Sequence, residues 1–170
     1  MSPQFSHGPA ATLWAAVALT CLTLLAHGPA GAAARAGAQA PTFRLEGFDG
    51  STVTLARFAG RPLYINVFAS WCPPCRDEFP RIVAAQQRFG GRVAFLAVST
   101  QEAAAPARRF ASEMHATFPV AIDRGRMGIA YGAVSLPDSF FIDRHGVVRA
   151  VVHGPVDRVT LERDLTEIAG

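Results

Sequence analysis

The chain has 170 residues, of which 50% are hydrophobic and 17% are charged, and its formal net charge is +3. This composition is that of a folded chain and excludes an intrinsically disordered one. Basic and acidic residues are interspersed and no basic run is longer than Arg108-Arg109, so the concentrated basic face of a nucleic-acid-binding protein is not indicated. The length predicts one domain with a short additional segment.

The first 38 residues differ from the rest because they contain a single charge, Arg35. The apolar run over residues 13–26 has the length of a secretory signal, and A-x-A cleavage sites follow it, Ala36-Gly37-Ala38 among them. Residues 1–10 lack Lys and Arg, and an apolar run counted over residues 10–26 would serve as a membrane anchor. We therefore expect residues 1–38 to be a cleaved signal peptide or an N-terminal membrane anchor with an Ala/Gly-rich spacer. Residues 39–170 would then form a domain that lies outside the cytoplasm.

Hydrophobic patterning predicts the elements of this domain in chain order. They are a hairpin of strands at 43–45 and 52–55, a buried strand at 63–68, a helix at 77–89 that begins near a C-x-x-C motif, a strand at 93–98, a helix at 103–115, a short strand at 118–122, a hairpin of strands at 139–142 and 147–152, and a last helix capped by Asp157 with Val159, Leu161, Leu165 and Ile168 facing inward. The order β-α-β-α requires a parallel pair of strands with a right-handed crossover, and the second hairpin adds antiparallel strands. We expect an α/β fold with a mixed central sheet flanked by helices and an N-terminal hairpin extension.

The cysteines are too few for a structural disulfide framework. Cys21 lies inside the apolar N-terminal run, where a small hydrophobic side chain is the simplest interpretation, and Cys72 and Cys75 form an isolated C-x-x-C pair. The pair follows a buried strand and begins a helix, a position at which open α/β sheets carry their sites. An isolated pair of this kind in an oxidising compartment is either a functional redox-active disulfide or a site of unwanted reaction.

Thiol–disulfide exchange needs a nucleophilic thiolate and a second thiol that resolves the mixed disulfide. We expect Cys72 to be an exposed N-cap residue whose thiolate is stabilised by the free N–H groups and dipole of the helix, and Cys75 to be the shielded resolving thiol. Pro73 and Pro74 fit the first helical turn but lack N–H groups, which leaves those of Cys75 and Arg76 as donors. A less stabilised thiolate favours a reductant over an oxidant.

A C-x-x-C pair also occurs as half of a zinc site, which needs two further Cys or His ligands at suitable spacing. The sequence provides no further Cys in the domain, and His115, His145 and His153 are scattered, so we predict no metal and no cofactor. A copper metallochaperone would bind the ion through the two thiolates and a nearby Met or His. Met127 is the methionine that could approach the pair.

The run over residues 68–80, FASWCPPCRDEFP, resembles the thioredoxin-like proteins of the TlpA/ResA/CcmG branch. The similarity covers nearly all of residues 41–154 and includes Phe118-Pro119-Val120, Tyr131-Gly132, Pro137 and the run FFIDRHG at 140–146. The resemblance implies a thioredoxin fold and a periplasmic or membrane-anchored thiol–disulfide oxidoreductase with a redox-active Cys72–Cys75 disulfide.

The resemblance also implies roles for residues around the pair. Pro137 matches the family's cis-proline, which together with Leu136 shapes the site and helps to hold extended substrate; an ordinary trans proline is the alternative. Glu78, one turn after Cys75, matches an acid that exchanges protons with the cysteines or tunes them; a solvated surface charge is the alternative. Trp71 would shield the disulfide and offer contact surface.

Three further positions bear on the comparison with this family. Asn66 stands where thioredoxin has a buried acid, so proton handling would fall to Glu78 or water. Asp138 stands where the wider family often has Thr and the cytochrome-c-maturation members often have an acid. Pro80 matches a proline that kinks the active-site helix.

These observations predict an exported protein-disulfide reductase, with apocytochrome c or a copper-site protein as a candidate substrate and a membrane thiol protein as electron donor. The alternatives are a disulfide oxidant or isomerase and a copper-binding metallochaperone. We expect a monomer that binds no nucleic acid.

Overall fold

The structure is a computed structural model that describes residues 1–2 and 33–170. Cys21 and the apolar run over residues 13–26 lie outside the described residues, so the signal or anchor remains a prediction. Within the part that is described, no helix is both long enough and apolar enough to cross a membrane.

The domain is built on a mixed seven-stranded sheet with the strand order β2-β1-β5-β4-β3-β6-β7. Its strands are β1 (Arg44–Gly47), β2 (Thr52–Thr54), β3 (Leu63–Phe68), β4 (Ala94–Ser99), β5 (Val120–Ile122), β6 (Asp138–Ile142) and β7 (Val148–His153). The helices are η1 (Leu55–Phe58), α1 (Pro73–Phe89), α2 (Ala104–Glu113), α3 (Arg126–Tyr131) and α4 (Arg158–Ala169). Strands β3, β4 and β5 are parallel, and the pairs β1–β2, β1–β5, β3–β6 and β6–β7 are antiparallel. The expected mixed sheet of a thioredoxin fold is confirmed.

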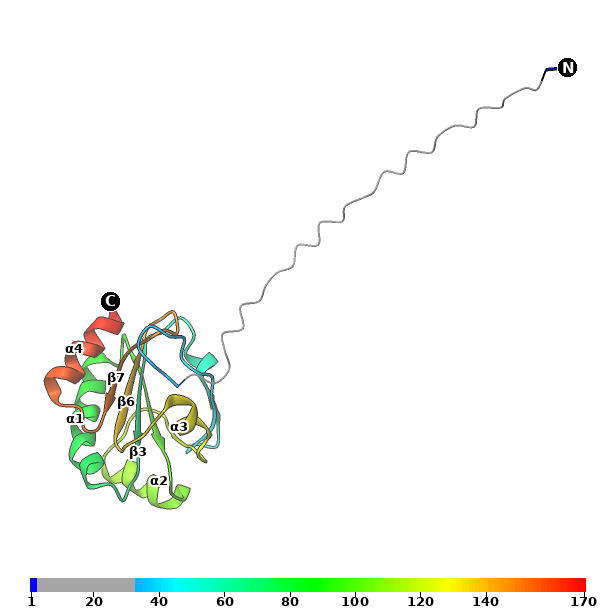
Figure 1. The fold of residues 1–170 in the computed structure, drawn as a ribbon. Coiled ribbons are helices and arrows are strands. Elements are labelled where there is room, and N and C mark those ends of the chain that lie inside the picture. Colours follow the sequence, from blue (N-terminus) through cyan, green and yellow to red (C-terminus); the bar gives the residue numbers. More distant parts are fainter. Residues whose placement is uncertain (3–32) are drawn as a thin grey trace. The chain divides into compact units, whose positions relative to one another are not determined.

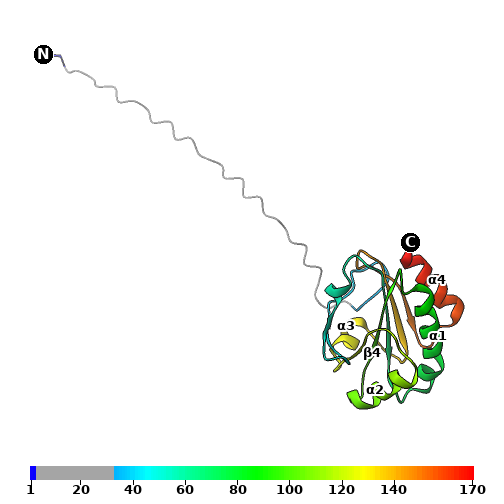
Figure 2. The ribbon, with the colours of Figure 1, turned by 180° about the vertical axis from the view of Figure 1, so that it is seen from behind.

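Two hydrophobic clusters fill the two faces of this sheet. The side chains of β3 alternate, so Tyr64 and Phe68 join the cluster under α1 and α4, whereas Ile65 and Val67 join the cluster under α3. Figures 1 and 2 show α1 and α4 side by side on one side of the sheet and α3 on the other. The C-x-x-C cysteines belong to the first cluster.

Helix α1 begins four residues earlier than the hydrophobic pattern predicts. Cys72 is its N-cap, with extended backbone angles, and Pro73 and Pro74 form the first turn. Prolines are tolerated there because the first N–H groups of a helix have no partner within it. Pro80 lies inside the helix, where its missing N–H removes one backbone bond.

Helix α3 was not predicted. It has only six residues and lies between Gly125 and Gly132, both with positive φ angles. The Asp123 carboxylate accepts hydrogen bonds from the backbone N–H groups of Met127 and Gly128 and so stabilises its start. So short a segment gives no reliable helical periodicity.

The prediction that Val159 faces inward in the last helix is wrong, because it is 73% exposed. Leu161, Leu165 and Ile168 are buried as predicted. Two residues along a helix correspond to a rotation of about 200°, so Val159 and Leu161 face opposite sides.

Residues 37–40 pair with the start of β7, partly ahead of the boundary that we predict at residue 39. The N–H of Gly37 donates to the carbonyl of Val148 (2.8 Å), and the N–H of Val148 donates to the carbonyl of Ala38 (2.9 Å). Gln39 forms an antiparallel bridge with Val147. The sheet edge formed by β7 is therefore covered at its beginning.

The N-cap of α4 provides a test of the fold. Asp157 Oδ1 accepts from the N–H groups of Val159 (2.8 Å) and Thr160 (3.0 Å). We expect Asp157→Ala to lower the free energy of unfolding by about 1 kcal/mol, measured by urea denaturation. Asp157→Asn, which keeps an accepting oxygen, should retain most of the stability; equal losses in the two variants would contradict the capping role.

Candidate active site

The C-x-x-C pair lies where β3 leads into α1. The N–H of Cys72 donates to the carbonyl of Ala69 (3.2 Å), which closes the turn before the helix. The Cys72 and Cys75 sulfurs are bonded to each other, with a Cα–Cα distance of 5.3 Å. The N–H of Cys75 also donates to Cys72 Sγ (3.2 Å), so a helix N–H group points at this sulfur.

Cys72 is 3% exposed and Cys75 is 1% exposed, so the expectation of an exposed Cys72 is wrong. Cys72 lines a surface hollow and does not lie on a convex surface. This hollow has a volume of about 350 Å³ and is lined by Trp71, Cys72, Pro73, Pro74, Gln101, Val134, Ser135 and Leu136. Cys72 contributes to its lining and Cys75 does not, so the disulfide is approached from the side of Cys72.

Only one of the two expected N–H donors faces the Cys72 sulfur. The N–H of Arg76 donates to the backbone carbonyl of Cys72 (3.2 Å) and begins the helical bonding pattern. Pro73 and Pro74 have no N–H to contribute. The N–H of Cys75 is therefore the backbone donor recorded at the sulfur.

The loop before β6 forms the opposite wall of the hollow. The peptide bond between Leu136 and Pro137 is cis, Pro137 is buried, and Leu136 lines the hollow. Trp71, on the other wall, is 58% exposed. Of the expected site-shaping residues, Trp71, Pro73, Pro74 and Leu136 line the hollow together with Cys72, whereas Pro137 is not part of its lining.

Asp138 holds this loop in place, which the sequence did not indicate. Its side chain is fully buried and accepts from the N–H of Val134 (3.0 Å), the hydroxyl of Ser135 (2.7 Å) and the N–H of Gly154 (3.2 Å). His153 Nδ1 lies 3.1 Å from the same carboxylate. Asp side chains commonly accept hydrogen bonds from backbone N–H groups of neighbouring turn residues, but the sequence does not show which turn Asp138 would hold.

Glu78 is buried, with 1% exposure, and is therefore not a solvated surface charge. Its Oε1 accepts from Asn66 Nδ2 (2.8 Å) and its Oε2 from the N–H of Val156 (2.6 Å). Burial disfavours the charged form and raises the pKa of Glu78 to about 7, although these two hydrogen bonds oppose the shift. Asn66, which cannot ionise, fixes the orientation of the carboxyl group that can.

Met127 does not approach the cysteines. It is 2% exposed and packs in the cluster on the opposite face of the sheet. Among residues 1–2 and 33–170, no group of three His, Cys, Asp or Glu side chains is arranged to hold a metal ion. The structure offers no support for Met127 as a copper ligand.

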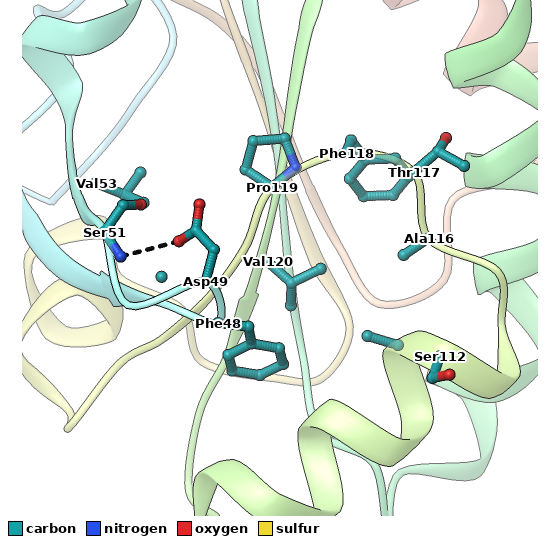
Figure 3. A pocket seen from close by; sticks show the side chains of 12 residues that line it. Phe48, Asp49, Ser51, Val53, Ser112, Ala116, Thr117, Phe118, Pro119 and Val120 are labelled. Atoms are coloured by element: carbon teal, nitrogen blue, oxygen red, sulfur yellow. Dashed lines mark hydrogen bonds between the residues drawn. The ribbon is translucent and has the colours of Figure 1, made fainter.

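A larger hollow, of about 540 Å³, lies between the β1–β2 turn, the end of α2 and residues 116–120 (Figure 3). Asp49 is the carboxyl group in its lining, and Asp49 Oδ1 accepts from the N–H of Ser51 (2.9 Å). Hydrogen bonds with Ser51 lower the pKa of Asp49. This carboxylate stabilises its own turn, and neither cysteine lines this hollow.

Comparison with known proteins agrees with this geometry. The Redoxin family profile matches residues 35–167. The chain belongs to the Redoxin family. It is 30% identical over 132 residues to the thioredoxin-like protein YneN of Bacillus subtilis, which covers 76% of this chain and 78% of that protein. It is 32% identical over 136 residues to the thiol–disulfide oxidoreductase ResA of Geobacillus thermodenitrificans, which covers 78% of this chain and 77% of that protein.

A solved structure leads to the same branch. A Chlorobium tepidum protein assigned as the thiol:disulfide interchange protein DsbE superposes with a TM-score of 0.76 at 32% identity and covers 81% of this chain and 100% of that one. This Redoxin-family chain is a thioredoxin-like thiol–disulfide oxidoreductase of the TlpA/ResA/CcmG branch.

The raised pKa of Glu78 predicts how stability depends on pH. Between its ordinary value of 4.5 and about 7, Glu78 is protonated in the folded protein and ionised in the unfolded one. The folded state then binds more protons, so stability falls as pH rises through this window and levels off above it. Glu78→Gln stays neutral and should show a flatter dependence, measured by urea denaturation of the oxidised protein at pH 4 to 9.

The exposed Glu167 provides the control, because Glu167→Gln should retain the wild-type pH dependence. Glu78→Gln can accept only one of the two hydrogen bonds, so its stability should be lower at acidic pH. If its decline between pH 4.5 and 7 matched that of the wild type, the assignment of this titration to Glu78 would be wrong.

Proposed function

We propose that this oxidoreductase is an exported reductase of protein disulfides, in which Cys72 attacks and Cys75 resolves. One observation carries the assignment: Cys72 Sγ lies at the N-terminus of α1, receives the Cys75 N–H, and belongs to the lining of the surface hollow. Cys75 lies deeper and does not line the hollow. A substrate sulfur would therefore reach Cys72 first.

The exchange proceeds in two balanced steps. The Cys72 thiolate of the reduced protein attacks one sulfur of a substrate disulfide, which forms a mixed disulfide and releases the other substrate sulfur as a thiolate. Deprotonated Cys75 then attacks Cys72 Sγ, which releases the second substrate thiol and leaves the Cys72–Cys75 disulfide. Two electrons pass to the substrate, and a membrane thiol protein would return two electrons to the pair.

Glu78 is the proposed proton acceptor for Cys75. It lies one helical turn after Cys75 on α1, and burial raises its pKa to about 7. A carboxyl group with a pKa near neutrality can both accept and return a proton at neutral pH. The hydrogen bond from Asn66 keeps this group oriented within the core.

The proposed reducing direction follows from the environment of the Cys72 sulfur. Each N–H group directed at a thiolate stabilises it, and a strongly stabilised thiolate makes the reduced form stable and the disulfide a strong oxidant. Here Pro73 and Pro74 occupy the first helical turn without N–H groups, and the Arg76 N–H is bonded to a carbonyl. A disulfide oxidant or isomerase is the alternative, since one structural relative is assigned as an interchange protein.

The proposed substrates are exported proteins, with apocytochrome c or a copper-site protein as candidates. Trp71, Leu136 and Pro137 would hold an extended substrate segment beside Cys72, since Trp71 and Leu136 line the hollow. The apolar run over residues 13–26 supports export, and the proposed location is the periplasm, with the domain either free or anchored by residues 1–38. We propose a monomer as the working form.

The order of attack can be tested by trapping. Cys75→Ser leaves the mixed disulfide of Cys72 unresolved, so it should accumulate covalent complexes with a disulfide substrate on non-reducing gels. Cys72→Ser removes the attacking thiol and should accumulate few. Trapping by Cys72→Ser alone would reverse the assignment.

The direction of the reaction can be tested by equilibration with glutathione buffers. We expect a potential nearer that of thioredoxin, about −270 mV, than that of a strong periplasmic oxidase, about −120 mV. A potential above about −180 mV would contradict the reductase proposal and favour the alternative in which the protein is a disulfide oxidant.

A further inference from the structure

The loops that follow β3 and β4 meet beside the disulfide. The two strands are parallel neighbours, so both end at the same edge of the sheet. The N–H of Thr100 donates to the carbonyl of Phe68 (3.0 Å) and ties the two loops at their start. Ser70, on the first loop, and Glu102, on the second, therefore come within reach of each other.

The Glu102 side chain binds Ser70 on the first loop at both the backbone N–H and the side-chain hydroxyl of Ser70. Glu102 Oε1 accepts from the N–H of Ser70 (2.7 Å) and from the hydroxyl of Ser99 (2.7 Å). Glu102 Oε2 accepts from the hydroxyl of Ser70. A carboxylate that accepts several hydrogen bonds in a partly buried setting holds its donors more firmly than a neutral acceptor does.

The backbone before Glu102 is bent in an unusual way. Gln101 has a φ of 59°, in the left-handed region that non-glycine residues rarely adopt. Such a conformation is unfavourable and persists only where surrounding contacts enforce it. The three hydrogen bonds of Glu102 supply such contacts, and Gln101 itself lines the hollow above Cys72.

Ser70 is the residue before Trp71 and two residues before Cys72. The turn that contains it is closed by the hydrogen bond from the Cys72 N–H to the Ala69 carbonyl. Within that turn, the bonds to Glu102 hold the Ala69–Ser70 peptide group and the Ser70 hydroxyl, directly before Trp71. Trp71 is 58% exposed, so its own packing constrains it little.

We propose that Glu102 is a positioning residue that, through Ser70, sets the placement of Trp71 and Cys72 for a protein substrate. Glu102 does not line the hollow. A small disulfide needs only access to Cys72 Sγ, whereas a protein disulfide must also fit against Trp71. The loss of Glu102 should therefore slow exchange with proteins more than exchange with small molecules. The proposal for Glu102 depends on the proposed reductase function in one respect, which is that the assays follow the reduction of a disulfide substrate.

The variants Glu102→Ala and Glu102→Gln separate positioning from charge. The Gln amide oxygen can accept from the Ser70 N–H and the Ser99 hydroxyl, and its NH₂ group can donate to the Ser70 hydroxyl. Gln therefore retains the contacts and removes the negative charge, whereas Ala removes both. Ser70→Ala removes only the side-chain bond and keeps the backbone bond, so it is a milder second variant. Glu167→Ala, on the exposed side of α4, is the control.

The rate of insulin reduction is compared with the rate of oxidised-glutathione reduction for each variant. For Glu102→Ala we expect the rate of insulin reduction to fall about fivefold, a factor that corresponds to the net free energy of about one hydrogen bond. The rate of glutathione reduction should change less than about twofold. Glu102→Gln should remain within about twofold of wild type on both substrates, and Ser70→Ala should fall between the two variants. An equal loss on both substrates, no loss, or a loss in Gln as large as in Ala would overturn the proposal.

Tryptophan fluorescence provides a second measurement, and a general loss of stability would not change it while the variant is folded. In a Trp14→Phe background the emission reports Trp71, which lies next to the disulfide in sequence. Glu102→Ala should change the ratio of reduced to oxidised emission at a temperature where the variant is folded, and Glu102→Gln should not; an unchanged ratio in Ala would contradict the proposal. If wild type oxidises proteins instead of reducing them, the reductase proposal fails, and the variant ratios are then measured with a reduced protein substrate.

Discussion

The active-site end of α1 depends on the packing of Phe79 against aromatic rings from three other parts of the chain. Its ring centroid lies 5.3 Å from that of Phe68 on β3, 5.0 Å from that of Phe110 on α2 and 6.0 Å from that of Phe118 before β5. Aromatic pairs at these distances combine buried area with preferred geometry. The packing seats the first turns of α1 on the sheet, which places the cysteines beside β3 and removes Glu78 from water.

Three carboxyl groups around the disulfide illustrate how surroundings decide what an acid does. Glu78 is enclosed in the core with two donors, and its pKa rises to about 7, so it can exchange a proton. Asp138 is fully buried and accepts from donors in the loop before β6 and just after β7, so it holds the loop that carries Pro137 in place. Glu102 joins two loops at the sheet edge. In the proposals made above, the same functional group therefore has three roles near the disulfide: proton exchange for Glu78, loop structure for Asp138 and positioning for Glu102.

The pattern of strands and the C-x-x-C motif were predictable because both follow from short-range sequence signals. Buried strands read as apolar runs, and prolines beside a cysteine mark a helix start. The shielding of Cys72 was not predictable, since the hollow that it lines is formed in part by residues 134–136, some 60 residues away in sequence. The partnership of Asn66 with Glu78 likewise joins two elements through a tertiary contact. Local patterns identified the reacting groups, whereas contacts between distant segments determine their exposure and protonation.

The pairing of residues 37–40 with β7 has a consequence for how the domain behaves among other copies of itself. β7 is the last strand of the sheet, and an outer strand presents N–H and C=O groups that can pair with another chain. Gly37 and Ala38 occupy the backbone C=O and N–H of Val148, and the N–H of Ala40 donates to the carbonyl of Gly146. A chain shortened through Gln39 would leave this stretch of the edge open to intermolecular β-pairing. The few residues that lead into the domain therefore also protect it against aggregation.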